Sequence, residues 1–491
     1  MVSNNKQPNV IIVYADDLGY GDLSCYGGVG VKTPNIDRLL ENGTKFTDGY
    51  STSAVCTPAR YSVLTGEYPF RNPRTYILPG DAPCIISKEK LTLPKIFKKA
   101  GYNTAIVGQW HLGLGEGNLD WNQDITHTPN DIGFDYSFIF PATNDRVPCV
   151  YIRNRRVANL DPNDPIEVSY ADECPYDDIP TSTNNPELLR MKHSHGHDQS
   201  IINGIGRIGY MRGGKKALWR DEDLAETFLN EVKSFITENN NNPFFVFYAL
   251  HQPHVPRVPN PRFVGASGLG PRGDVIVEMD WCVGELIDHL EREGLLEDTI
   301  IIFSSDNGPV LDDGYHDDAQ RLNKMCMHKP AGPLRGGKYS KFDGGTRVPF
   351  IVSWVSHIKP QTSSALVSQV DFMASFASML DVDLEDGAPD SLDMMDVLLG
   401  ESHIGRTEIL GEAANKSHFL RNGKWTYLQP KEGPAVNYYT DIELGSSLDP
   451  QLYNMEYDIG QRENVAQLHM DIVEKMDKRI EEIKAGNYTR K

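Results

Sequence analysis

The sequence predicts an α/β fold in which helices flank a mostly parallel central sheet. Apolar, β-branched runs such as "NVIIVYA" have the composition of strands that are buried on both faces. Helical patterns alternate with these runs along the chain, which is the order that βα units produce. A chain of 491 residues is long enough for one large domain and a smaller one.

The elements of the large domain have individual local signals. "TPNIDRLLENG" begins with Thr33-Pro34 and ends at Gly43, a start and a stop that are typical of helices. "VSQVDFMASFASML" has the pattern of the last helix of this domain. Three longer segments each combine a helix, a turn and a strand: "LPKIFKKAGYNTAIVGQWH", "DEDLAETFLNEVKSFITENNNNPFFVFYALHQPH" and "VIVEMDWCVGELIDHLEREGLLEDTIIIFSSDNG".

We expect residues 1–400 to form the large domain and residues 401–491 a small C-terminal α+β subdomain with an antiparallel sheet. Asn422-Gly423 lies between two strand-like runs and indicates a hairpin in this subdomain. Within the large domain, residues 141–219 are rich in polar residues and proline and show little periodicity. Because so long an irregular stretch is uncommon as a connector, we expect substrate-facing loops there.

Composition excludes several functional classes. The formal net charge of -20 argues against a nucleic-acid partner, and no apolar run reaches the length of a membrane span. The start, "MVSNNKQPNV", lacks the apolar core of a signal peptide, so we expect either a cytoplasmic protein or a periplasmic or secreted one whose signal was removed. The seven cysteines form no C-x-x-C pair, which argues against a zinc ribbon or a dithiol redox site.

Polar residues stand at the ends of four predicted strands. In an open α/β sheet the carboxyl ends of the strands border one crevice, so residues distant in sequence become neighbours there. The four groups are Asp16-Asp17, Gln109-Trp110-His111, His251 to His254, and Asp306-Asn307.

The acidic members of this set predict a site for a hard cation such as Ca²⁺. Asp16, Asp17, Asp306 and Asn307 offer only oxygen ligands, whereas Zn²⁺ calls for histidine or cysteine. Either pair alone is also an ordinary turn signal. Because both pairs directly follow a buried strand, we favour the metal site.

Basic side chains are candidates for catalysis beside such a site. His111 and His254 are candidate acid–base groups, although a single strand-end histidine is more often structural. Lys338 lies in a Gly-rich segment that allows close approach to a ligand, with a solvated loop lysine as the alternative. Cys56 and Arg60 share one face if their segment is helical, and a helix N-terminus there would favour an anion.

Other polar residues allow two interpretations. His251 is either a second substrate contact or a structural residue. The alternating His193, His195 and His197 favour an exposed polar loop over a metal site. Arg146 belongs to an arginine-rich stretch that could bind an anionic glycan, although a solvated charge run is favoured; the stretch also holds Arg153, Arg155 and Arg156.

Seven segments together match a known family in its order: "VYADDLGYGDLSCYGG", "TPNIDRLLENGTKF", "CTPARYSVLTG", "GQWHLG", "FYALHQPHVP", "SSDNGP" and "GGTRVPFIV". The chain therefore resembles, over nearly its whole length, the type I, formylglycine-dependent sulfatases of the alkaline phosphatase superfamily. C-x-P-x-R followed by S-x-L-T-G is a highly specific signal. The resemblance implies an alkaline-phosphatase-like large domain.

The resemblance also implies how Cys56 would act. A maturation enzyme reads C-x-P-x-R and oxidises the cysteine to formylglycine, whose hydrate carries the attacking hydroxyl. Attack on sulfur expels the alcohol and leaves a sulfo-enzyme intermediate, from which the second hydroxyl expels sulfate. The modified residue would share one Ca²⁺ with Asp16, Asp17, Asp306 and Asn307.

Sulfate binding and acid–base work fall by the same resemblance on Arg60, His111, His254 and Lys338. His111 would be the base for the formylglycine hydroxyl. His254 and Lys338 would hold sulfate oxygens, and one of them would protonate the leaving oxygen.

One position departs from the family pattern. Gln109 stands where the family usually has a lysine that helps to bind sulfate. Glutamine donates hydrogen bonds without a charge, and charge-assisted bonds are roughly twice as strong. Either another cation compensates, with Arg335 and Lys341 as candidates, or the site is weakened.

The segment 141–219 is similar to that of bacterial carbohydrate sulfatases acting on galactose or N-acetylgalactosamine units. We therefore expect exo-desulfation of a sulfated sugar during glycan degradation, with O4 as the expected position. Two alternatives remain: a phosphonate or phosphodiester hydrolase of the same superfamily, and a glycan-binding pseudoenzyme, which Gln109 would favour.

Overall fold

The structure, a computed structural model, describes residues 7–490 and contains a ten-stranded sheet. Its strands are β1 (Asn9–Ala15), β2 (Gly43–Phe46), β4 (Asn103–Gln109), β5 (Tyr136–Phe140), β6 (Ile152–Arg153), β7 (Arg156–Val157), β12 (Phe244–Ala249), β13 (Thr299–Ser305), β14 (Phe350–Ser353) and β15 (Gln361–Ser363). Their order in the sheet is β15-β2-β14-β13-β1-β12-β4-β5-β6-β7.

The middle of this sheet is parallel, as the sequence predicts. β13, β1, β12, β4 and β5 run in the same direction, and their carboxyl ends meet along one edge. β14 and β6 run antiparallel to their neighbours on the two flanks. The predicted α/β class is therefore confirmed.

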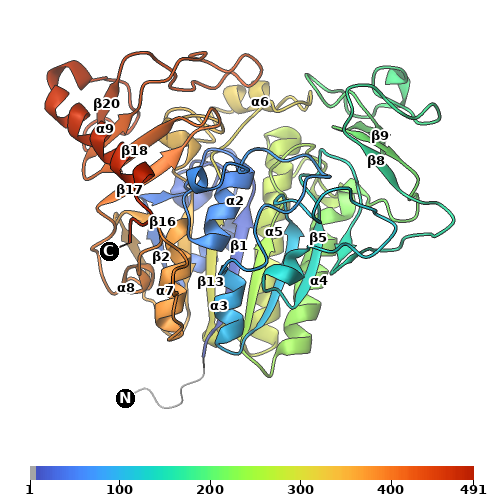
Figure 1. Ribbon diagram of the computed structural model, residues 1–491, viewed down its shortest axis with the longest axis horizontal. Helices are drawn as coiled ribbons and strands as arrows, with labels where there is room; N and C mark the ends of the chain where they lie inside the picture. Colours follow the sequence, from blue (N-terminus) through green and yellow to red (C-terminus); the bar gives the residue numbers. More distant parts are fainter. Residues whose placement is uncertain (1–6, 491) are drawn as a thin grey trace.

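Helices cover both faces of the sheet, which explains why its strands are apolar throughout. On one face lie α2 (Cys56–Thr65), α3 (Leu93–Lys99) and α7 (Phe372–Met379), and on the other lie α1 (Pro34–Arg38), α4 (Leu224–Asn239) and α5 (Gly270–Arg292). Figure 1 shows α2 at the upper end of the central strands, where their carboxyl ends lie. Two shorter helices are α6 (Ala319–Met325) and α8 (Met395–Leu398).

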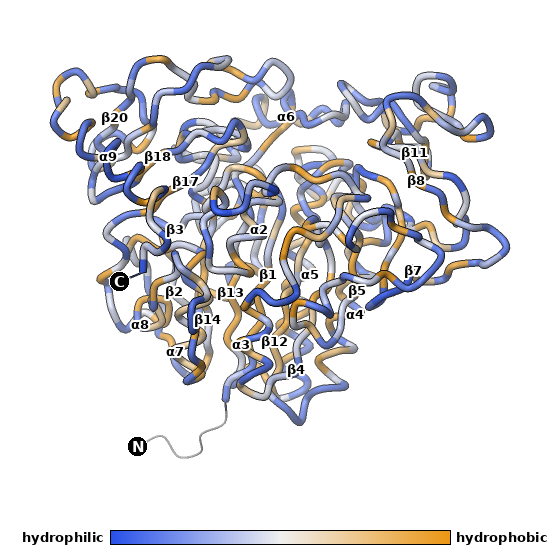
Figure 2. The backbone as a smooth tube through the Cα atoms, in the orientation of Figure 1, coloured by the Kyte–Doolittle hydropathy of each residue, from blue (hydrophilic) through white to orange (hydrophobic). Residues whose placement is uncertain are grey.

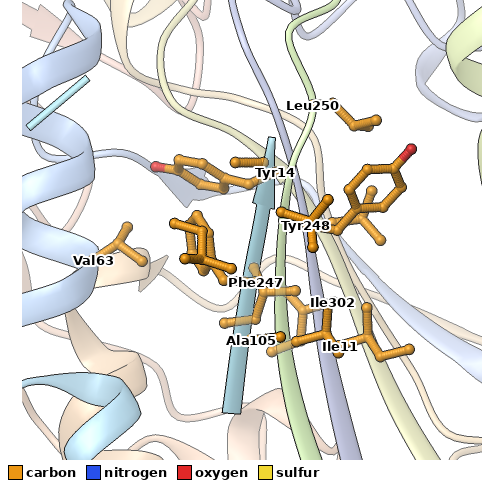
Figure 3. Packing of buried hydrophobic residues seen from close by; sticks show 14 of the residues in the cluster. Ile11, Tyr14, Val63, Ala105, Phe247, Tyr248, Leu250 and Ile302 are labelled. Carbon is orange, nitrogen blue, oxygen red and sulfur yellow. The ribbon is translucent and has the colours of Figure 1, made fainter. Parts of the chain in front are cut away.

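Side chains from the sheet and from the helices that cover it form one large hydrophobic cluster. Tyr14 of β1 lies 5.4 Å from Phe247 of β12, between ring centroids, and Val63 of α2 is buried in the same cluster (Figure 3). Hydrophobic segments gather along the central strands and the helices that face them (Figure 2).

The segment between Pro141 and Trp219 contains little regular structure beyond short strand pairs. β6 and β7 extend the central sheet, and the remainder forms small two-stranded ribbons. These ribbons are β8 (Glu167–Ser169) with β11 (Tyr210–Arg212), and β9 (Ile201–Ile202) with β10 (Ile205–Gly206). Another short pair joins β3 (Gly49–Tyr50) to β16 (Val367–Ser368).

A four-stranded antiparallel sheet lies near the C-terminus, as predicted. It consists of β17 (Glu408–Glu412), β18 (His418–Asn422), β19 (Trp425–Leu428) and β20 (Gln451–Asn454), and α9 (Met470–Ala485) packs on it. The predicted hairpin at Asn422-Gly423 joins β18 to β19. The domain boundary near residue 400 stays a prediction.

None of the helices within residues 7–490 combines the length and the apolar character that crossing a membrane requires.

Stability of the large domain should depend on Phe97, a fully buried residue of α3 that faces the sheet. Its ring stacks on Phe245 of β12 at 4.1 Å and also contacts Tyr102 and Phe376. We expect Phe97→Ala to destabilise the fold by about 3–5 kcal/mol through lost burial and the cavity left behind. The measurement is the thermal unfolding midpoint.

Leu468→Ala is the control, because that side chain is 77% exposed and its loss should leave the midpoint nearly unchanged. A Phe97→Ala midpoint equal to that of the control would contradict the packing described here.

Candidate active site

Cys56 is the first residue of α2, and the start of this helix lies at the carboxyl edge of the sheet (Figure 1). Arg60 follows one turn later on the same face, as the sequence predicts. The Sγ of Cys56 is 3.3 Å from Asp16 Oδ1, and the Arg60 guanidinium is 3.3 Å from Asp16 Oδ2. Both side chains are 2% exposed. Cysteine and arginine are thus held over the same carboxylate.

The two predicted acidic pairs meet beside Cys56. Asp16 and Asp17 follow β1, while Asp306 and Asn307 follow β13, its parallel neighbour. Ligand atoms of Asp16, Asp17, Cys56 and Asp306 all lie within 4.8 Å of one another. Asp17 adopts a positive φ of 62°, a strained conformation of the kind found at functional sites.

The chemistry of this cluster fits a hard divalent cation. The Oδ1 atom of Asn307 is buried and has no hydrogen-bond partner within the described residues, although its amide donates to Asp17 at 2.7 Å. Burial, together with neighbouring carboxylates, raises the pKa of Asp16 well above its usual range, and burial likewise raises the pKa of Asp306. Crowded buried acids and an unpaired amide oxygen are the ligands that Ca²⁺ prefers.

Charge balance supports the same conclusion. The buried ion pairs of the cluster join two cations to four carboxylates, so a divalent cation would neutralise the excess. The cations are Arg60 and Lys338, and the carboxylates are Asp16, Asp17, Asp306 and Asp313.

Lys338 is buried in the site rather than solvated. Its Nζ lies 2.9 Å from Asp17 Oδ2 and 2.8 Å from Asp313 Oδ2. Burial opposes the charge, but these two carboxylates outweigh it and raise the pKa of Lys338. Burial also opposes ionisation of Asp313, yet Lys338 lowers the pKa of that carboxyl to about 2. The lysine is therefore a fixed cation beside the acidic cluster.

The two candidate catalytic histidines lie in the same cavity with different hydrogen bonds. His111 Nε2 donates to the Leu78 carbonyl at 3.1 Å, which leaves its buried Nδ1 unprotonated and unpaired among the described residues. His254 Nδ1 donates to the Val255 carbonyl at 2.6 Å, and its Nε2 is 3.8 Å from Asp17 Oδ2. Burial lowers the pKa of both rings.

A cavity of about 230 Å³ opens onto these groups. Its lining combines predicted residues with side chains from the 141–219 segment and from the loop after β13. The lining residues are Cys56, Ile77, His111, Asp145, Arg146, His195, Gly196, His197, Ile208, His254, Asp313, Lys338 and Tyr339.

The interpretation of the alternating histidines as an exposed loop is wrong for His197. This ring is 7% exposed, and its Nε2 lies 2.8 Å from Asp145 Oδ2. Asp145 also binds Arg146 at 2.8 Å, so the pair is one wall of the cavity. Asp145, Asp313 and Tyr339 were missed, because a single acid or tyrosine in a loop has no distinguishing sequence pattern.

Gln109 and His251 occupy different positions relative to the cluster. Gln109, the last residue of β4, donates from its amide to Asp16, while its Oε1 is buried without a partner among residues 7–490. His251 packs against Phe140 and Phe228 and is not among the cavity-lining residues. Burial lowers the pKa of His251 to about 3, consistent with a neutral ring in an aromatic environment.

The structure does not bring the two proposed compensating cations into the cluster. Arg335 binds Glu443 and the Gln461 carbonyl, and Lys341 donates to the Gln429 carbonyl at 2.7 Å. Three arginines of the 141–219 segment are likewise paired with nearby acids: Arg153 with Glu231, Arg155 with Asp131 and Arg156 with Asp124.

A comparison with family models and a comparison with individual proteins both match the chain to sulfatases. A family model described as Sulfatase matches residues 8–382. The chain is 49% identical over 484 residues to an N-acetylgalactosamine-6-O-sulfatase of Bacteroides thetaiotaomicron, covering 98% of this chain and 94% of that protein. Identity to arylsulfatase A of Homo sapiens is 28% over 478 residues, covering 94% of this chain and 83% of that protein.

A solved structure concerned with the metabolism of multiple glycosaminoglycans by Bacteroides thetaiotaomicron superposes with a TM-score of 0.96. It is 48% identical in sequence, and the match covers 98% of this chain and all 100% of that one.

Calcium should stabilise the folded chain through the acidic cluster. Adding Ca²⁺ to chelator-treated protein is expected to raise the thermal unfolding midpoint. A ligand at a hundred times its dissociation constant stabilises by about 2.7 kcal/mol. Asp306→Asn, which removes one charge at nearly constant shape, should abolish most of the calcium effect.

Asp449→Asn is the matched control, since this aspartate is exposed in the C-terminal part of the chain and should leave the calcium effect intact. An equal calcium response in the Asp306→Asn variant would place the cation elsewhere.

Proposed function

The chain belongs to the sulfatase family, and we propose that it removes the 6-O-sulfate from a terminal N-acetylgalactosamine of a glycan. The observation that carries the proposal is the buried Cys56 at the start of α2, beside an acidic cluster and inside a cavity lined by His111, His254 and Lys338. The 49% identical relative supports N-acetylgalactosamine as the sugar and favours O6 over the O4 position expected from sequence.

In this proposal a maturation enzyme converts the Cys56 thiol to the aldehyde of formylglycine, a two-electron oxidation that uses dioxygen as the oxidant and releases the sulfur as sulfide. When present, formylglycine supplies a hydrated aldehyde as nucleophile and Ca²⁺ supplies positive charge beside it. Asp16, Asp17, Asp306 and Asn307 would hold the cation, as their oxygen-only ligand set indicates. The net reaction splits the S–O bond of R–O–SO₃⁻ with one water and yields R–OH and hydrogen sulfate.

Lys338 lines the cavity and would orient the sulfate, whereas Arg60 is not among the lining residues and holds Asp306 and Asp16 beside it. Lys338 is fixed by Asp17 and Asp313, and Arg60 is fixed by Asp306, so neither has to be ordered when substrate arrives. A preorganised positive charge also stabilises the charge that develops on sulfate oxygens in the transition state.

Proton transfer falls to the two histidines. Since His111 Nε2 is committed to Leu78, its free Nδ1 is the atom that can accept a proton from the hydroxyl at position 56. His254 has the opposite arrangement, with Nδ1 committed to Val255 and Nε2 facing the Asp17 side of the cavity. We assign protonation of the leaving oxygen to His254, because a bound sulfate anion would favour its charged form.

The role of His254 can be tested by replacement. We expect His254→Ala to lower kcat/KM for sulfate release by roughly 10²–10⁴-fold, the usual contribution of a positioned acid. His357→Ala, at a partly exposed histidine paired with Glu401, is the control and should retain activity. Unchanged turnover by His254→Ala would leave the leaving-group role to Lys338.

Gln109 makes a second test available. Gln109→Lys would put an ammonium next to Asp16 in the position where the family usually has one. Because a charge-assisted hydrogen bond is about twice as strong as a neutral one, kcat/KM for sulfate release should rise, by roughly three- to tenfold. A fall in kcat/KM at an unchanged unfolding midpoint would show that the site is adapted to the neutral amide.

Mass spectrometry of the Cys56 peptide, combined with sulfate release from N-acetylgalactosamine 6-sulfate and 4-sulfate, tests the proposal directly. We expect conversion of the thiol to an aldehyde and release from the 6-sulfate. Release from the 4-sulfate alone would overturn the assigned position. Turnover of phosphonate esters alone would favour the phosphonate hydrolase alternative, and no turnover by fully converted protein would favour the pseudoenzyme.

A further inference from the structure

Two neighbouring aromatic side chains, Tyr438 and Tyr439, are exposed, and the second of them contacts a residue that lines the active-site cavity. Tyr438 is 91% exposed and Tyr439 is 56% exposed, and their rings meet edge to face at 5.2 Å. Exposure of a single tyrosine is common, but an exposed pair of rings beside a cavity offers a contiguous apolar surface to a ligand. Neither residue has a role in the reaction proposed above.

Tyr439 connects to the cavity through His195. The two rings stack at 4.3 Å with an interplanar angle of 17°. His195 lines the cavity that contains Cys56, whereas Tyr439 belongs to the C-terminal subdomain. Figure 1 shows the strand pairs β8 and β9 of the 141–219 segment on one side of the upper face and the C-terminal sheet on the other, with α6 between them. His195 and Tyr439 belong to loops that extend toward each other from these two sides. The stack therefore joins them at the cavity rim.

Both halves of the stack are held in place before any ligand binds. Ser194, the neighbour of His195, donates to Asp312 at 2.6 Å and to the Gly314 carbonyl at 2.9 Å. On the other side, Asn437 Oδ1 accepts from the Tyr439 amide at 3.0 Å within a hairpin that is closed by the Val436–Glu443 bridge. A rigid aromatic surface loses little entropy on binding, which favours affinity.

Space for more than one sugar lies beside this rim. The cavity at Cys56 has about 230 Å³, whereas a second cavity of about 490 Å³ begins next to Tyr439, at Thr440 and Asp441. Lys324 of α6 also lines the second cavity. A chain of sugars could thus leave the first cavity, cross Tyr439 and continue into the second.

We propose that Tyr439, stacked on His195, is the platform for the second sugar of the substrate, so that the enzyme recognises the end of an oligosaccharide. The exposed ring face offers the flat apolar surface on which the C–H face of a pyranose packs, and the phenol oxygen offers a hydrogen bond. This inference rests on the proposed function, because it presumes that the first sugar occupies the cavity at Cys56.

The test compares two substrates with fully converted protein. One is N-acetylgalactosamine 6-sulfate, and the other is a disaccharide with the same sulfated sugar at its non-reducing end. The measured quantity is the ratio of kcat/KM for the disaccharide to kcat/KM for the monosaccharide. We expect Tyr439→Ala to lower this ratio by roughly three- to tenfold, the range that one aromatic contact supplies.

Two controls separate this effect from a general loss of structure. Tyr439→Phe keeps the ring and should retain most of the ratio. Tyr457→Ala removes an 85% exposed tyrosine from the same subdomain and should leave the ratio unchanged. An unchanged ratio in Tyr439→Ala overturns this inference alone, whereas no sulfate release by the parent protein from either substrate overturns the proposed function and this inference with it.

Discussion

The buried guanidinium of Arg60 is the interaction on which the site depends. It binds Asp306 at the end of β13, Asp16 at the end of β1 and the carbonyl of Gln109 at the end of β4. One side chain thus ties three parallel strands to the second turn of α2. Removing one partner from a buried ion pair typically costs 3–5 kcal/mol, because the remaining charge is left unpaired.

Ion pairing to Arg60 also explains how several buried charges can lie so close together. Arg60 and Lys338 offset only part of the negative charge of the carboxylates around them. The mutual repulsion of these buried carboxylates favours binding of a divalent cation. The positive charge of that cation would in turn attract an anionic substrate. With a divalent cation bound, the two cations and four carboxylates of the cluster would be neutral in sum, so a sulfate ester would meet no net negative charge there although the chain has a net charge of -20.

Much of this arrangement could be predicted from the sequence. Strand-end polar residues such as Asp16 and Asn307 follow long apolar runs, so both the parallel sheet and the convergence at its edge were predictable. The positions of Arg335 and His197 were not. Which loop folds over the cavity depends on pairings between distant segments, such as His197 with Asp145, and local sequence contains no signal for them.

The depth of Cys56 has a consequence for biogenesis. The backbone just before it, at Thr52 and Ala54, pairs with Glu412 of β17, so the last-synthesised part of the chain closes over a motif near its beginning. In the finished fold both Cys56 and Arg60 are 2% exposed. If the proposed maturation enzyme reads this motif, it would have to meet the chain before folding is complete, between emergence of residue 60 and arrival of the C-terminal sheet. The timing of folding, and not only its outcome, would then determine whether the protein becomes active.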